Sequence, residues 1–197
     1  TGEMYDKKDS YDAPWYTKNL VINKVVIEEG VESIGGYAFY NCYNLTDIDI
    51  PSTVRKIGVG AFLSCGILAE VNLPDAVEEI GDMAFMYCYK LQNITIPEKV
   101  SKIPSHIFYD CFELETVEYS DNVTEIGKNA FNRCWKLKNA FAGKGIEKIG
   151  DGAFYECKAL TEIIIPDTVV EIGRMAFGDC ENVTTLVIGS GVEFIDE

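Results

Sequence analysis

The stretch of sequence that decides the fold is Glu70–Leu91, which reads EVNLPDAVEEIGDMAFMYCYKL. Its first four residues alternate polar and apolar side chains, and this period of two predicts a half-buried β-strand. Pro74 ends the strand, because proline has no N–H to donate to a neighbouring strand. Gly81 indicates a corner, and the apolar spacing within Met83–Cys88 is typical of a short helical turn. The stretch therefore predicts one strand, one corner and one turn.

The same pattern recurs along nearly the whole chain at a fixed step of 23 residues. One position of the repeat is always cysteine, at Cys42, Cys65, Cys88, Cys111, Cys134, Cys157 and Cys180. Another is always phenylalanine, at Phe39, Phe62, Phe85, Phe108, Phe131, Phe154 and Phe177. A fixed period of this length indicates a solenoid, in which each unit buries its apolar layer only by stacking on its neighbours. We expect the strands to form one parallel sheet along the coil.

Composition and charge narrow the classes of partner. The chain has 197 residues, of which 47% are hydrophobic and 25% charged, as in an ordinary folded protein. Its formal net charge of −15 argues against nucleic acid and anionic membranes, which are held chiefly by Lys and Arg. No apolar run approaches the roughly 20 residues that span a bilayer, so we expect no membrane insertion. Thr1–Asp12 does not read as a signal peptide, which is therefore absent or already removed.

The cysteine column predicts buried, reduced thiols. Disulfide frameworks use irregular spacings, whereas all seven cysteines here share one position of the repeat. A buried free cysteine behaves as a small hydrophobic residue. We expect no zinc site, because a linear row of thiols does not form a tetrahedron.

The repeat resembles a known family. The pattern I-P-x-x-V-x-x-I-G-x-x-A-F-x-x-C-x-x-L occurs cleanly at Ile165–Val183 and in altered form at Ile96–Leu114, where Pro104 and Ile107 replace Gly and Ala. It is similar to the BspA-type (Treponema-type) leucine-rich repeat of bacterial and some protist surface proteins. The resemblance covers Val25–Glu197. It implies an α/β leucine-rich-repeat solenoid, a right-handed coil with one parallel strand per unit and short helical turns opposite. It also implies a secreted or cell-attached, adhesive or protein-binding role without catalytic residues.

The chain divides into two parts. Residues 1–22 lie outside the period, and we interpret them as an N-terminal tail and cap whose aromatic residues cover the first unit. Residues 23–197 form the solenoid, with seven full units and a partial eighth. Because the eighth unit stops at Glu197, just after Ile195, and nothing closes the stack, we expect the chain to be a fragment of a longer protein.

Binding residues are expected among side chains that point outward from the strands, because packing explains the inward ones. One outward column turns apolar at its end, where Phe141, Ile164 and Val187 follow one another on successive units. Contiguous apolar patches on soluble proteins often mark contact sites. With Glu118 and Glu162 beside them, these three residues form the predicted protein-binding patch. The alternatives are plain strand propensity and, for Phe141, a bulge that turns its ring inward between Ala140 and Ala142.

A second candidate surface is aromatic and flanks the cysteine column. Its members are Tyr43, Tyr89, Phe112 and Trp135. Such side chains stack on sugars or anchor proteins, so a glycan is the alternative partner. The competing interpretation is that they pack half-buried against adjacent turns.

No residues are assigned to catalysis, a cofactor or a metal. His106 is the single histidine and shares its unit with Cys111, but that cysteine belongs to the buried column, and a nucleophile must be reachable. The carboxylates Asp47, Asp49 and Glu70 read as an acidic solvated face, since calcium usually takes six or more oxygens. The sequence therefore predicts a non-enzymatic extracellular recognition or adhesion module. The alternatives are a structural spacer that presents a neighbouring domain, and a glycan-binding module.

Overall fold

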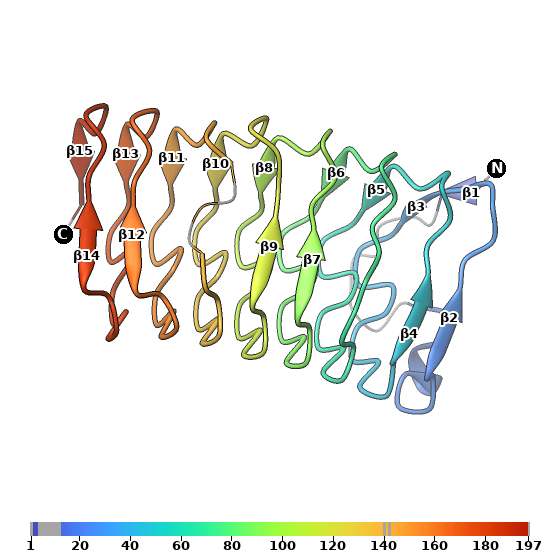
Figure 1. Ribbon diagram of the computed structural model, residues 1–197. Coiled ribbons are helices and arrows are strands. Elements are labelled where there is room, and N and C mark those ends of the chain that lie inside the picture. The colour runs from blue at the N-terminus through green and yellow to red at the C-terminus, as the bar shows by residue number, and fades with distance from the viewer. Residues whose placement is uncertain (1, 4–12, 140, 142, 197) are drawn as a thin grey trace.

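The computed structural model describes residues 2–3, 13–139, 141 and 143–196. The units of the repeat stack side by side into an elongated coil, with the N-terminus at one end and the C-terminus at the other (Figure 1). We number the complete units from the strand that begins at Lys24, so that unit 3 is Glu70–Gln92 and unit 4 is Asn93–Glu115. This arrangement confirms the predicted parallel solenoid.

Strands run along two sides of the coil, and every pairing in the described part of the chain is parallel. The first side, called the strand face, carries β2 (Lys24–Val26), β4 (Asp47–Asp49), β7 (Asn93–Thr95), β9 (Thr116–Glu118), β12 (Glu162–Ile164) and β14 (Thr185–Val187). The second side, called the isoleucine sheet, carries β3 (Val31–Ile34), β5 (Lys56–Ile57), β6 (Glu79–Ile80), β8 (Lys102–Ile103), β10 (Glu125–Ile126), β11 (Lys148–Ile149), β13 (Glu171–Ile172) and β15 (Phe194–Ile195). β1 (Gly2–Glu3) pairs with β3 at the N-terminal edge.

The isoleucine sheet differs from the expectation of one strand per unit. Its residues stack in register, with Ile57 opposite Ile80 and Ile126 opposite Ile149. Their backbone groups therefore pair between units, and the pairing continues through the next residue, since Gly81 N–H donates to the Ile57 carbonyl at 2.8 Å. Apart from β3, each strand of this sheet is two residues long, which is too short for an alternating pattern to predict it from sequence.

The helical turns that the sequence predicted opposite the strands are not confirmed. In the described residues, the segments equivalent to Met83–Cys88 are hydrogen-bonded turns, and the single helix is the 3-10 turn η1 (Tyr16–Lys18). Met83 and Tyr87 have φ of 58° and 62°, which a right-handed helix excludes. The Tyr87 N–H instead donates to the Tyr109 carbonyl of the next unit at 2.9 Å. Pairing between units thus replaces the bonds within a helix.

The core is a continuous stack of identical side chains. Neighbouring phenylalanine rings lie nearly parallel, with ring centroids 5.3 Å apart for Phe62 and Phe85 and 5.1 Å apart for Phe131 and Phe154. Each thiol from Cys65 onward donates to a phenylalanine carbonyl, as Cys111 does to Phe85 at 3.2 Å. The prediction of unpaired, buried thiols is confirmed for six cysteines, while Cys180 is half-buried.

The two ends of the stack differ. At the N-terminal end the Trp15 ring stacks on Phe39 with centroids 5.5 Å apart, and its indole N–H donates to the Ala38 carbonyl at 2.6 Å. The interpretation of residues 1–22 as a tail and cap stays a prediction. Residues 1 and 4–12 of that segment lie outside the described residues. In the eighth unit, Leu186 and Ile195 occupy inward columns yet are exposed.

The boundary between units 3 and 4, called the 3/4 seam, interrupts the isoleucine sheet. Pro104 stands where the other complete units have glycine, and it has no N–H to donate to the preceding unit. The bond that Gly81 makes at the previous boundary is therefore missing here. β6 and β8 accordingly belong to different sheets.

Steric contact at Pro104 widens the same seam. A Cβ added to Gly127, the equivalent residue of the next unit, would lie 2.6 Å from the Ser105 backbone nitrogen. Pro104 carries such a Cβ, which crowds the backbones of units 3 and 4 at the point where the hydrogen bond between them is also missing. The Phe85 and Phe108 centroids are 6.0 Å apart across the seam, against 5.3 Å at the previous boundary. The stack continues through the seam, but it is looser there.

Candidate interaction surface

The apolar end of the strand face is formed by two neighbouring strands. Ile164 of β12 lies opposite Val187 of β14, and the two side chains are 53% and 48% exposed. Glu162 precedes them on β12, is also exposed and has no ion pair among the described residues. Parallel pairing holds the two apolar side chains one strand apart, so they form a single patch with a carboxylate beside it. We call Ile164 and Val187 the apolar pair.

Phe141 does not extend this patch as predicted. It is half-buried, and its ring packs edge-on against Phe154 and Phe177, with centroids 5.8 and 6.3 Å away. Its flanking residues, Ala140 and Ala142, lie outside the described residues. The Phe141 ring thus packs toward the core instead of projecting into solvent. The outward apolar column therefore begins at Ile164.

Glu118 lies apart from the apolar pair. It ends β9, is exposed, and accepts a long hydrogen bond of 3.5 Å from the Thr95 hydroxyl. Unit 6, which contains Phe141, separates Glu118 from β12. Of the five residues predicted to bind protein, the structure brings together Ile164, Val187 and Glu162.

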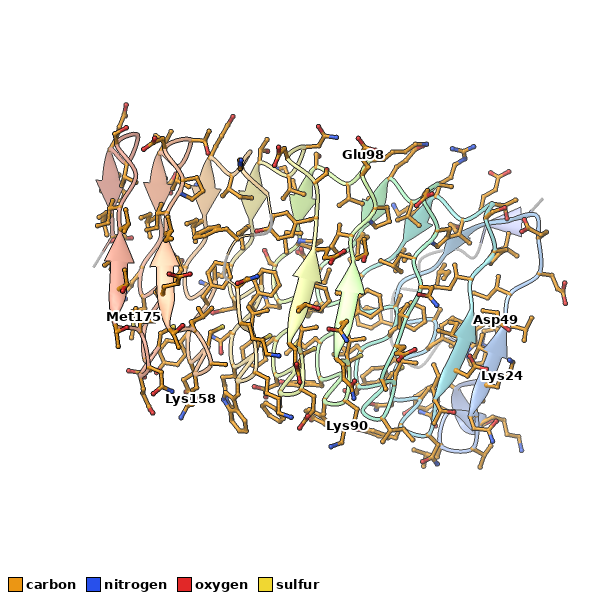
Figure 2. All side chains as sticks on the ribbon, in the orientation of Figure 1. Lys24, Asp49, Lys90, Glu98, Lys158 and Met175 are labelled. Carbon is orange, nitrogen blue, oxygen red and sulfur yellow. The ribbon has the colours of Figure 1, made fainter. Side chains whose placement is uncertain are left out.

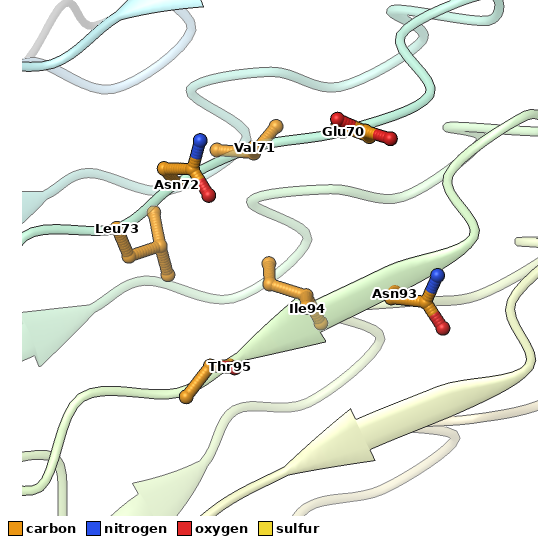
Figure 3. A pocket seen from close by; sticks show the side chains of 7 residues that line it. All are labelled: Glu70, Val71, Asn72, Leu73, Asn93, Ile94 and Thr95. Carbon is orange, nitrogen blue, oxygen red and sulfur yellow. The ribbon is translucent and has the colours of Figure 1, made fainter.

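The strand face opens at the 3/4 seam. Glu70 still bridges Asn93, but the two chains then diverge and leave a pocket of about 250 Å³. Figure 3 shows the pocket, which is lined by Glu70, Val71, Asn72, Leu73, Asn93, Ile94 and Thr95. The sequence prediction missed this pocket. Pro104, already visible as a departure from the repeat, is the signal that marks the seam.

Charges on the neighbouring units are mostly paired. Lys24 donates to Asp47 at 2.6 Å and lies 3.3 Å from Asp49, and Figure 2 shows Lys24 and Asp49 together at the N-terminal end. These pairs are half-exposed, so they contribute little to stability. They do show that two of the three carboxylates interpreted as an acidic face are partly neutralised, whereas Glu70 has no ion pair in the described chain.

The predicted aromatic residues form a stacked column. Tyr89 stacks on Phe112 with centroids 5.3 Å apart, and Phe112 stacks on Trp135 at 4.2 Å. Tyr43 lies farther along, separated from Tyr89 by the unit of Gly66. Tyr43, Tyr89 and Trp135 remain 37–43% exposed. Phe112 has a stacked ring on both faces, so it presents chiefly its edge to solvent.

A charged group lies under the aromatic column. Arg133 contacts both rings, with its guanidinium carbon 5.5 Å from the Phe112 centroid and 5.4 Å from that of Trp135. It also lies 3.2 Å from the buried carboxylate of Asp110. Burial raises the pKa of Asp110, while the neighbouring guanidinium opposes that shift. The arrangement fixes Arg133 against the rings, so we interpret it as structural.

The thiols and the histidine do not form a nucleophilic site. Burial raises the pKa of Cys88 to about 12 and that of Cys111 well above its usual value. Reactive thiols need the opposite shift. His106 pairs with Asn129, whose Nδ2 is 3.1 Å from its Nε2, and burial lowers its pKa.

Two searches of the described residues concern metals and membranes. No group of three or more His, Cys, Asp or Glu side chains comes close enough to hold a metal ion. Within the same residues, none of the helical structure has the length and apolar character needed to cross a bilayer.

Several solved structures are similar to this chain. A leucine-rich cell surface protein of Faecalibacterium prausnitzii is 26% identical with a TM-score of 0.65, and the match covers 98% of this chain and 66% of that protein. A leucine-rich repeat protein of Eubacterium ventriosum is 26% identical with a TM-score of 0.59, covering 98% and 67%. TpLRR, the leucine-rich repeat protein of T. pallidum, is 28% identical with a TM-score of 0.60, covering 88% and 73%. The chain thus spans about two-thirds of the first of these proteins.

Curated protein sequences give no match. The family model of the BspA-type leucine-rich repeat region, in contrast, matches residues 15–138 and 124–197. These two matches cover nearly the entire chain and coincide with the stacked units of the structure. The chain therefore belongs to the BspA-type leucine-rich repeat family.

Proposed function

We propose that this chain is a non-enzymatic recognition or adhesion module that binds another protein through its strand face. The observation that carries the proposal is the apolar pair, Ile164 and Val187, exposed on neighbouring strands beside Glu162. Exposed apolar side chains held together on a rigid sheet supply the desolvated centre of an interface, and a rim carboxylate adds selectivity. Family membership supports the role, since leucine-rich solenoids present extended surfaces to partners.

The proposed location is extracellular, either secreted or attached to a bacterial surface. The support is the likeness to the cell surface protein of Faecalibacterium prausnitzii together with the family match. The partner would then be a protein of a host or of another cell surface.

The test compares two changes in the same outward column. Chemical cross-linking on intact cells first identifies a partner, and its affinity is then measured by biolayer interferometry. The double variant Ile164→Ser with Val187→Ser is expected to bind at least 10-fold more weakly. Val26→Ser, at a position 55% exposed on β2, is the matched control and should bind normally. Unchanged affinity in the double variant would reject the apolar pair as the binding site.

A spacer is the second candidate. Ion pairs repeatedly join one unit to the next, as between Lys102 and Glu125 at 2.7 Å and Lys148 and Glu171 at 2.8 Å. These ion pairs neutralise surface charges within the chain itself, so the charges need no partner protein. This suits a stalk that presents a neighbouring domain. A stalk predicts that the isolated chain captures no surface protein in the cross-linking experiment.

The aromatic column supports glycan binding less well than protein binding. A sugar stacks on the face of a ring, but Phe112 has a neighbour on both faces, Tyr89 and Trp135. Trp135, at the end of the column, and the separate Tyr43 remain as glycan candidates. Binding on a carbohydrate array that disappears in Trp135→Ala would favour that alternative.

A further inference from the structure

The pocket at the 3/4 seam contains a backbone N–H whose equivalents are hydrogen-bonded beside the strand pairs β2–β4, β7–β9 and β12–β14. Ile96 N–H donates to the Glu118 carbonyl at 2.7 Å, and Ile165 N–H donates to Val187 at 2.9 Å. The equivalent residue of unit 3 is Leu73, whose N–H makes no such bond within the described residues. Backbone polar groups that lose their partner must be hydrated or bound by a ligand. The opened seam therefore offers hydrogen-bonding groups to an incoming side chain.

The pocket also has an apolar floor and a free carboxylate at its rim. Val71 and Ile94 are 5% and 3% exposed, and half-buried Leu73 lies beside them. Glu70 and Asn72 are exposed, and neither side chain has a hydrogen bond or ion pair in the part of the chain that the structure describes. Figure 3 shows Glu70 at one end of the pocket, with Asn72 and Leu73 farther along the same chain.

This combination matches one type of side chain. An arginine or lysine has a long apolar stem, which suits the floor, and a cationic head, which suits a carboxylate and an amide oxygen. The pocket of about 250 Å³ accepts one extended side chain and is too small for a helix. The nearest lysine on the strand face, Lys24, is already held by Asp47 and Asp49.

We propose that the pocket at the 3/4 seam binds an arginine or lysine side chain of a partner protein, with Glu70 holding its charge. The net charge of −15 favours the approach of such a basic partner. This inference rests on the proposed function, because it adds an anchor point to the same protein-binding face. It concerns units 3 and 4, whereas the apolar pair lies on units 7 and 8.

The test uses a defined probe in place of the unidentified partner. N-acetyl-arginine amide is titrated into the ¹⁵N-labelled chain, and amide chemical shifts are followed by NMR. We expect saturable shifts confined to residues 70–73 and 93–95. The uncharged analogue N-acetyl-citrulline amide should bind at least 10-fold more weakly, and Glu70→Gln should weaken arginine binding at least 5-fold.

Glu162→Gln is the matched control, because Glu162 occupies the same column on the intact strand β12. It should leave arginine binding unchanged. Equal losses in both variants, shifts spread over the whole acidic face, or equal binding of citrulline would overturn the proposal. So would stronger shifts at the same residues from a methyl pyranoside, which would indicate a sugar. The double variant of the apolar pair should retain arginine binding, so failure of the proposed function is distinguishable from failure of this pocket.

Discussion

The phenylalanine stack and the strand face belong to the same units, yet they differ in continuity. The rings stack without interruption from Phe39 to Phe177. Among the described residues, the strand face instead consists of three separate pairs of strands, β2 with β4, β7 with β9, and β12 with β14. The phenylalanine rings therefore stay stacked at the boundaries where the strands of the strand face are not hydrogen-bonded to each other. Packing of the dry interior therefore sets the stacking of the units, and the strand face is free to vary locally.

The largest effect is expected from raising the pH, because ionisation of the buried thiols opposes folding. The folded state raises the pKa of Cys42 and Cys180 to about 11 and of Cys88 to about 12, above the usual value of roughly 8.5. The unfolded chain then releases protons that the folded chain retains. Stability is therefore full below about pH 8.5 and falls by about 1.4 kcal/mol per thiol per pH unit as the pH rises toward the folded values. Urea unfolding between pH 7 and 10, with reductant present, measures this loss.

Removing one thiol provides the control for that experiment. In Cys88→Ala the free energy of unfolding should fall less steeply with pH, by the contribution of one thiol, because alanine does not ionise. A free energy of unfolding that stays constant from pH 8 to 10 would contradict the dry interior. Rapid labelling of the folded chain by a thiol reagent at pH 8 would contradict it as well.

The second effect compares two phenylalanines that stack differently. Phe131 is 1% exposed between Phe108 and Phe154, so Phe131→Ala should lower the free energy of unfolding by about 3–5 kcal/mol. Phe141 is half-buried and touches the stack only by its edge, so Phe141→Ala should cost less. Denaturant unfolding followed by circular dichroism measures both. Equal costs would mean that the edge contact matters as much as the stack.

The third effect tests how Pro104 opens the seam. In Gly127→Ala the new Cβ would meet the Ser105 nitrogen at 2.6 Å, so we expect a loss of about 1–3 kcal/mol from overpacking. Pro104→Ala adds no Cβ and restores an N–H, so it should change stability by less than about 1 kcal/mol. Thermal unfolding of the two variants measures the contrast. A similar loss in both would show that the seam is not widened by the Cβ of Pro104.

The interior columns were predictable because identical residues at identical phase bury one another. The 23-residue period alone was enough to predict that Phe62, Cys65 and their equivalents lie in the core. The second strand at Glu79–Ile80 was not predictable in the same way, because two residues carry no alternation. The turn at Met83–Cys88 has helical spacing of apolar residues, but bonds between units replaced those within a helix.

The candidate site was only partly predictable. Alternation correctly pointed Ile164 and Val187 outward, because both lie on regular paired strands. It failed at Phe141, where no described strand forms and packing on Phe154 prevailed. The seam pocket lies at the same boundary between units as Pro104, whose missing N–H interrupts the isoleucine sheet on the other side of the coil. A pattern within one unit does not contain that information.

The smallest effect is expected from Ile164→Ser, and its neighbour on the same strand shows why. Ile163 and Ile164 differ in exposure, at 3% and 53%, because successive side chains of a strand point to opposite faces. Ile164→Ser removes little buried surface, so the free energy of unfolding should change by less than about 0.5 kcal/mol. Ile163→Ser places a hydroxyl in the core and should cost several times more. Urea unfolding of the two variants measures the difference. A large loss at Ile164 would mean that its side chain stabilises the coil, and the apolar pair would then need no partner to explain it.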